Sequence, residues 1–260
     1  MAVISQIGDW TGGWQTPAIV FAGALVGGFV NGLTGFGTAL TGLPIWLHGV
    51  PPAIAAQLAS ACSVLGHISA FPSLRRAVDW RRLAPLIGAG LIGVPIGTLL
   101  LPYVSLGAFK RGVGGVLIAY CSFMLLAAGH VRPAAEGGSS RSCGAEAAVG
   151  FAAGMLGGLA ALSGVLPTVW ASLKAWPKDQ RRVYFQAFNF TVLSAMLAAS
   201  AALGQVGSAS LLALGVAAPG ALIGASLGLR LYRRLDDRRF DRLVLGVLLL
   251  SGLALLWSSL

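Results

Sequence analysis

Long runs of apolar residues constrain the fold of this chain more strongly than any other feature of its sequence. A helix needs about 20 mostly apolar residues to cross the hydrocarbon core of a bilayer. Apolar segments lie near 17–47, 52–71, 83–104, 107–129, 146–173, 183–203, 209–231 and 241–257. They are continuous, without the alternation of a membrane β-barrel strand. The sequence therefore predicts an all-α polytopic membrane protein, which we expect as a multi-pass protein of a bacterial inner membrane.

Composition and charge argue against a soluble or nucleic-acid-binding domain. Hydrophobic residues make up 56% of the chain and charged residues only 10%, and the mean hydropathy is +0.81. The net charge of +10 comes from Lys and Arg clustered at the ends of apolar segments, where such charges orient membrane proteins. We expect a lipid bilayer and a small solute as partners, and no nucleic acid. The cysteines lack metal-ligand spacing, so we expect no metal and no other cofactor.

The second half of the chain repeats the first. Five residues recur at an offset of 122: Gly28, Phe29, Gly32, Gly35 and Gly42 return as Gly150, Phe151, Gly154, Gly157 and Gly164. Residues 109–118 share six of ten positions with residues 240–249, and Gly93 and Gly97 align with Gly220 and Gly224. We interpret residues 1–260 as one transmembrane domain of two repeats, 17–129 and 146–257, joined by a linker at 130–145. Each repeat contains about four apolar segments.

The first segment of each repeat is too long and too rich in glycine to be one plain helix. Glycines interrupt it at 32–37 in the first repeat and at 154–158 in the second. Each flanking piece is roughly half as long as a spanning helix needs. Either a kinked span or a re-entrant hairpin fits this pattern.

The positive charges discriminate between these two arrangements, because cytoplasmic loops carry an excess of Lys and Arg. If both broken segments span the membrane, the 18 basic residues divide 12 to 6 between its two sides. If both are hairpins, they divide 16 to 2, with only Lys110 and Arg111 on the poorer side. The hairpin arrangement gives each repeat an odd number of crossings. It therefore predicts inverted repeats, with both termini outside the cytoplasm.

The chain resembles the sulfite exporter TauE/SafE family, also called the toluene sulfonate uptake permeases. The resemblance rests on the glycines and proline of 35–44, on their counterpart at 157–167, and on Trp-Pro-Lys-Asp-Gln-Arg-Arg at 176–182. Two glycines of the family pattern are Thr38 and Ala39 in this chain. The resemblance implies a secondary transporter of small organic or inorganic anions, often sulfur-containing, such as sulfite or sulfonates.

A helix that begins in mid-membrane points unpaired backbone amides and a positive dipole end into a medium of low dielectric constant, which favours an anion. In the hairpin arrangement, such helix starts near Thr38 and near 160–163 would face each other at the bilayer midplane, where inverted-repeat transporters bind substrate. The alternative is that these glycines only permit close packing or a kink. The candidate substrate-binding residues of the two breaks are Gly35, Phe36, Gly37, Thr38, Gly157, Gly158 and Ser163.

Polar side chains in the remaining apolar segments concentrate in two equivalent segments. The candidates are Gln57, Ser60, Ser63 and His67 in one, and Gln186 and Asn189 in the other. Amide and hydroxyl donors suit an oxyanion, although serine and threonine often bond to their own helix instead. His67 is a candidate for a proton-linked switch or for a structural hydrogen bond. No Asp or Glu lies deep in an apolar segment, which disfavours a carboxylate proton relay.

An intramembrane serine hydrolase is the competing class of protein, with Ser163 and His67 as its only reminiscent pair. The glycine expected two residues before that serine is Ala161, and the sequence lacks the His-Glu-x-x-His pattern of a metalloprotease. We therefore expect no enzyme activity. The sequence leaves open a carrier or an anion channel, uptake or export, and the oligomeric state.

Overall fold

The computed structural model describes residues 14–68, 80–128, 143–173 and 178–232, and in these ranges all regular structure is helical. The elements in chain order are α2 (Gln15–Thr34), α3 (Thr38–Trp46), α4 (Pro52–Ile68), α6 (Trp80–Leu100), the 3₁₀ turn η1 (Leu101–Tyr103), α7 (Leu106–Ala128), α8 (Cys143–Ala160), α9 (Val165–Leu173), α10 (Lys178–Ala202) and α11 (Ser208–Tyr232). The predicted linker, apart from its last residues, and the predicted segment at 241–257 lie outside the described residues.

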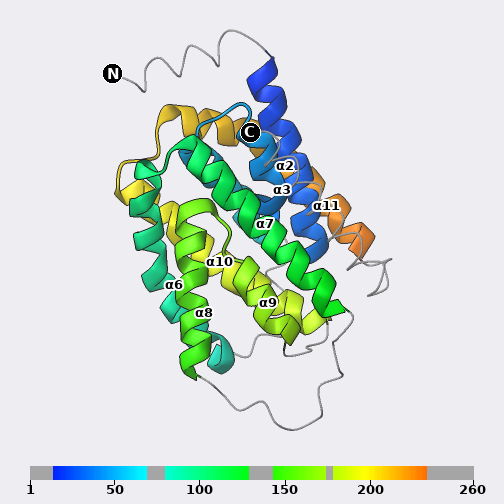
Figure 1. Cartoon of the computed structure of the whole chain (residues 1–260). Helices are drawn as coiled ribbons and strands as arrows, with labels where there is room; N and C mark the ends of the chain where they lie inside the picture. Colours follow the sequence, from blue (N-terminus) through cyan, green and yellow to red (C-terminus); the bar gives the residue numbers. More distant parts are fainter. Residues whose placement is uncertain (1–13, 69–79, 129–142, 174–177, 233–260) are drawn as a thin grey trace.

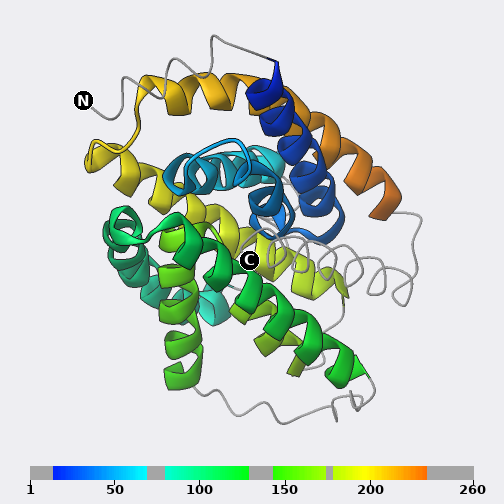
Figure 2. The ribbon, with the colours of Figure 1, turned by 45° about the horizontal axis from the view of Figure 1, so that its top comes forward.

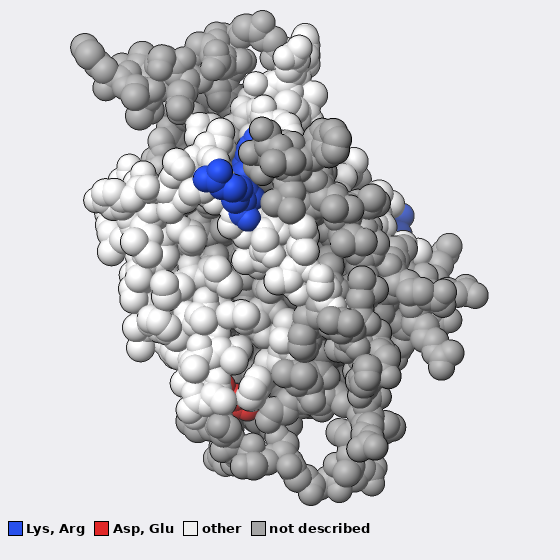
Figure 3. Space-filling model, in the orientation of Figure 1, with Lys and Arg blue, Asp and Glu red and all other residues white. Residues whose placement is uncertain are grey.

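Length and apolar composition make four of the described helices suitable for crossing a bilayer. They are Gln15–Thr34, Leu83–Tyr103, Arg182–Ala202 and Ser208–Tyr232. Large apolar side chains on α6 and α11 remain exposed, including Ile92 at 66% and Leu211 at 61%. The described part of the surface seen in Figure 3 carries only small charged areas. Such an uncharged, apolar exterior is what a lipid-facing surface requires, so the all-helical membrane architecture predicted from the sequence is confirmed.

Helices from the two halves of the sequence interlock. The most extensive contacts join α2 to α11 and α6 to α8, so each half contributes one helix to a pair with the other half. Both pairs lie side by side in Figures 1 and 2. The two halves therefore build one packed unit, not two separate bundles.

Glycines make both of these helix pairs possible, because a Cβ atom would collide with the backbone of the partner helix. Gly228 of α11 lies against the Phe29 carbonyl, and Gly93 of α6 lies against the Phe151 carbonyl. Phe29 and Phe151 are partners in the sequence repeat, so the two contacts match. By these contacts Gly93 corresponds to Gly228 and not to Gly220, with which the sequence alignment pairs it. Close approach of this kind is how helices associate in lipid.

The first broken segment folds back on itself. Trp46, at the end of α3, is fully buried, and its indole Nε1 donates a hydrogen bond to the Val20 carbonyl of α2 at 3.0 Å. The Trp46 ring also fills the space beside Gly23 of the same helix. The chain therefore turns between Thr34 and Thr38, and α3 returns along α2 as a hairpin arm. With 20 residues, α2 is as long as a full span, so the prediction that each flanking piece is about half a span is wrong for this arm.

The second break lies further along the chain than the sequence predicts. The glycines at 154–158 are helical, because α8 continues to Ala160, and α9 begins at Val165. Gly154 and Gly158 contact the carbonyls of Gly90 and Val94 on α6. The prediction of an interruption at 154–158 is therefore wrong: these glycines serve helix packing, and the break occupies residues 161–164.

Candidate functional site

The break between α2 and α3 is built from two glycines and one threonine. Gly35 and Gly37 have φ angles of +80° and +98°, a left-handed region that glycine adopts without strain. The Thr34 hydroxyl bonds to both backbone groups of Phe36: it accepts from the amide at 3.1 Å and donates to the carbonyl. Helix α3 then begins at Thr38, and its first intrahelical bond runs from the Thr41 amide to the Gly37 carbonyl at 3.2 Å. The amides of residues 38–40 precede that bond and are available to a ligand.

The break between α8 and α9 uses different chemistry. Ala161 has a φ of +55° although it carries a Cβ atom, which costs about 1 kcal/mol or more. Its amide caps α8 by donating to the Gly157 carbonyl at 2.8 Å. The fully buried Ser163 donates its hydroxyl proton to Oδ1 of Asn189 on α10 at 2.6 Å. This bond ties the second break to a neighbouring helix.

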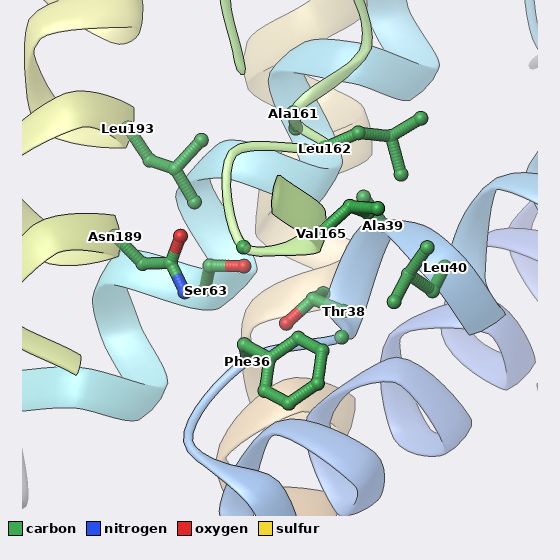
Figure 4. A pocket seen from close by; sticks show the side chains of 12 residues that line it. Phe36, Thr38, Ala39, Leu40, Ser63, Ala161, Leu162, Val165, Asn189 and Leu193 are labelled. Atoms are coloured by element: carbon green, nitrogen blue, oxygen red, sulfur yellow. The ribbon is translucent and has the colours of Figure 1, made fainter. Parts of the chain in front are cut away.

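The two breaks meet at a pocket. Its lining comes from both breaks, α4 and α10: Phe36, Gly37, Thr38, Ala39, Leu40, Ser63, Ala161, Leu162, Gly164, Val165, Asn189 and Leu193. Figure 4 shows the side chains of Thr38, Ser63 and Asn189 approaching this space from three different helices. Phe36 stacks edge-on against Phe185, with ring centroids 5.4 Å apart, which holds the tip of the first break in place.

Hydrogen-bond donors dominate the polar atoms of the pocket. The buried Thr38 hydroxyl has no partner among the described residues. Because Ser163 occupies Oδ1 of Asn189, the amide nitrogen of Asn189 is left to donate, and it lies 3.1 Å from the position that a Cβ atom on Gly164 would take. The N-terminal ends of α3 and α9 border the same space. Donors and positive dipole ends, with no carboxylate in the described lining, have the chemistry that suits an anion.

The pocket is narrow. The volume open to the centre of a water molecule is about 10 Å³, which is about enough for one water. A sulfite-sized anion would require the two breaks to separate slightly. The pocket as described is therefore too small for such an anion.

Helices α4 and α10 lie antiparallel across the pocket and present their polar residues to each other. Gln57 donates to the Gln205 carbonyl at 3.1 Å at one end, and Ser60 donates to the sulfur of Met196 at 3.1 Å. Ser63 and Asn189 share the pocket, and at the other end His67 of α4 and Arg182 of α10 both lie beside residues 31–32 of α2. We call these eight residues the polar seam: Gln57, Ser60, Ser63 and His67 on α4, and Arg182, Asn189, Met196 and Gln205 on or beside α10.

The predicted site residues divide into two groups. Phe36, Gly37, Thr38, Ser63 and Asn189 line the pocket, and Ser163 bonds to one of them. The remaining candidates lie outside the pocket. Three of them are glycines that pack against other residues: Gly35 beside Arg182 and the further candidate Gln186, Gly157 beside Ser163, and Gly158 between α8 and α6. The others belong to the polar seam: Gln57, Ser60 and His67. Ser163 donates to Asn189, and the His67 ring nitrogens have no partner among the described residues, so no serine and histidine pair of a hydrolase forms.

Sequence reasoning missed two residues near the site. Asn31, 1% exposed, donates from Nδ2 to the Ser63 carbonyl at 3.3 Å and so joins α2 to α4. Arg182 lies inside α10 and donates to the Gly32 carbonyl at 2.8 Å, whereas the sequence suggests a connector. The sequence offered no signal for Arg182, because it ends a charged run that is typical of a connector, whereas the structure begins α10 at Lys178.

Comparison with known proteins gives one match. A family model described as sulfite exporter TauE/SafE matches residues 19–255, which covers both breaks and the whole polar seam. Searches of curated proteins and of solved structures give no match.

Proposed function

The chain belongs to the sulfite exporter TauE/SafE family, a family of membrane transporters, and we propose that it carries small oxyanions such as sulfite or a small sulfonate through the pocket between its two breaks. The single observation that carries this proposal is the convergence of two helix starts with the Thr38, Ser63 and Asn189 donors on one enclosed space. Membership of this family implies that the chain is a transporter and not an enzyme.

The chemistry of the pocket supports weak binding of a singly charged anion. Each helix start stabilises an anion by about 0.3 to 2 kcal/mol, and neutral hydrogen bonds add about 0.5 to 1.5 kcal/mol each. No Lys or Arg lines the pocket to neutralise a second charge. We expect dissociation constants on the order of micromolar to millimolar, a range that allows release as well as capture.

We further propose that the two repeats are inverted and that the pocket lies near the bilayer midplane. The hairpin fold of α2 and α3 and the matching contacts of Gly228 and Gly93 support this arrangement. Alternating access would then follow from movement of one repeat against the other. The narrow pocket favours a carrier over an open channel, because an open channel needs a continuous wide path.

Flux measurements on the purified protein test the transport proposal. In proteoliposomes with an imposed sulfite gradient, the wild-type chain should move sulfite faster than protein-free vesicles do. Thr38→Asp places a negative charge where the anion should sit and should lower flux about a hundredfold or more. Thr38→Ser keeps the hydroxyl and should retain flux. Normal flux through a folded Thr38→Asp protein would show that the anion binds elsewhere.

Thiol labelling tests the topology separately. Single cysteines in the loops at 73–82 and 174–182 of a cysteine-free variant should resist an impermeant reagent added outside, whereas one at 47–51 should react. The charge distribution of 16 to 2 motivates this expectation. Labelling of the 73–82 loop from outside, with the 47–51 loop protected, would exclude the inverted arrangement.

A further inference from the structure

A buried histidine with neither ring nitrogen bonded lies next to the pocket. His67 is 1% exposed, and neither Nδ1 nor Nε2 has a partner in the part of the chain that the structure describes. A buried polar group left without a partner lowers the stability of the fold. The ring is therefore poised to bond to something that enters the protein, either water or a solute.

Arg182 supplies a positive charge at the same end of the polar seam. Its guanidinium donates from Nη2 to the Gly32 carbonyl at 2.8 Å, and Cζ lies 4.0 Å from the centroid of the Tyr232 ring. Arg182 and His67 both lie beside residues 31–32 of α2, because a Cβ atom on Gly66 would lie 2.5 Å from Nδ2 of Asn31, the residue next to Gly32. A guanidinium carries five N–H donors in a fixed fork, a geometry that suits an oxyanion.

The first break makes room for this arginine. A Cβ atom on Gly35 would lie 3.0 Å from Cγ of Arg182 and 2.9 Å from Cγ of Gln186. The glycine that ends α2 thus also lets the arginine stem lie across the break. The position of Arg182 is consequently part of the architecture of the hairpin, not the chance placement of a surface side chain.

Helix geometry places His67 and Arg182 close to the pocket. His67 lies four residues beyond Ser63, about 6 Å along α4, and Arg182 lies seven residues before Asn189, about 10 Å along α10. The other end of the seam is different. Aligning Gln57-x-x-Ser60 with Gln186-x-x-Asn189 gives Met196 as the counterpart of His67, and the sulfur of Met196 accepts the Ser60 hydroxyl at 3.1 Å. Only the His67 end of the seam therefore combines an unpartnered donor with a cation, within the described residues.

We infer that His67 and Arg182 form a second anion-binding station, one to two helical turns from the pocket, where a small oxyanion binds on its way between the pocket and the membrane side on which α10 begins. The neutral His67 ring donates one N–H, and Arg182 contributes charge-assisted hydrogen bonds. The station takes the same class of ligand as the pocket, so the inference rests on the proposed function.

The test measures initial rates of sulfite flux in proteoliposomes over a range of sulfite concentrations. Loss of a charge-assisted hydrogen bond in Arg182→Gln should raise KM about tenfold or more, with little change in the maximal rate per folded molecule. His67→Met, which installs the residue found at the counterpart position, should raise KM about three- to tenfold. His67→Gln retains an N–H donor and should stay near the wild-type value. Added inert salt should raise KM of the wild type more than that of Arg182→Gln, because ions screen the charge.

Two results would overturn the station. One is an unchanged KM in both folded Arg182→Gln and folded His67→Met, which would mean that the cluster holds only water. The other is an equal salt dependence of KM in the wild type and in Arg182→Gln. If Arg182→Gln does not fold, Arg182→Lys is measured instead. Lysine keeps the positive charge but lacks the planar set of guanidinium donors, so KM for sulfite should rise measurably but less than tenfold. Absence of flux in the wild type would instead refute the proposed function, so the two failures are distinguishable.

Discussion

The two helix breaks occupy equivalent places in the repeats, yet they are stabilised in different ways. The first has glycine at both left-handed positions and leaves the Thr38 hydroxyl without a partner in the described structure. The second places Ala161 in the left-handed region and commits the Ser163 hydroxyl to Asn189. The first break therefore offers donors to a ligand, while the second is fixed to α10.

This difference suggests a division of labour across the pocket. A ligand that bonds to Thr38 contacts the first hairpin, and one that bonds to Asn189 contacts a group already held by the second break. Strain such as that at Ala161 persists where surrounding contacts enforce it, often at functional sites. An anion that binds between the breaks would thus couple the hairpin of the first repeat to α10 of the second.

The largest effect should come from removing the group that joins the second break to the pocket. Asn189→Leu deletes a pocket donor and leaves the buried Ser163 hydroxyl unpaired, so sulfite flux should fall about a hundredfold. Gln57→Leu is the matched control, because Gln57 is a similarly buried amide that bonds to Gln205 away from the pocket lining. It should lower stability but keep flux per folded molecule. Equal flux in both variants would remove Asn189 from the site.

Stability measurements should show that the first break depends on glycine. Gly35→Ala forces a Cβ atom into the left-handed region and against the Arg182 and Gln186 side chains. The free energy of unfolding in detergent should fall by about 1 to 3 kcal/mol. Ala18→Gly, in the first turn of the same helix, should change it by less than about 1 kcal/mol. A Gly35→Ala protein as stable as the wild type would contradict the assigned backbone conformation.

A smaller effect on affinity should follow from removing the unpartnered hydroxyl of the first break. Thr38→Val keeps the shape of the side chain and loses one neutral donor, which should raise KM for sulfite about three- to tenfold. Thr41→Val serves as the control, because its hydroxyl bonds to the Gly37 carbonyl of its own helix at 3.1 Å. If both variants raise KM equally, the Thr38 hydroxyl makes no specific contact with the anion.

The smallest expected effect is a gain in stability at the second break. Ala161→Gly relieves the left-handed strain but adds freedom to the unfolded chain, so the net gain should be about 0.5 kcal/mol. Thermal unfolding in detergent would register it as a small rise in the midpoint. A loss of stability would mean that the packing of the Ala161 methyl group stabilises the fold by more than the backbone strain at this residue destabilises it.

Local pattern was enough to predict the helices and the first break. Continuous apolar runs of spanning length give helices in any membrane context, and the glycines at 35 and 37 allow the backbone angles of the turn. The proposed duplication rests on sequence matches alone. The six predicted candidates that line the pocket or bond within it were also predictable from the sequence: Phe36, Gly37, Thr38 and Ser163 lie at the breaks, Asn189 is a costly buried amide, and Ser63 shares its helix face with other polar residues.

Only the tertiary structure decided which glycines break a helix and which pack it. Gly154 and Gly158 have the same local freedom as Gly35, but they remain helical because the backbone of α6 lies against them. The antiparallel pairing of α4 with α10 likewise places His67 and Arg182, more than a hundred residues apart in the sequence, at the same end of the polar seam beside residues 31–32 of α2. Sequence periodicity reports which face of a helix is polar, whereas the partner that this face meets depends on how distant helices pack.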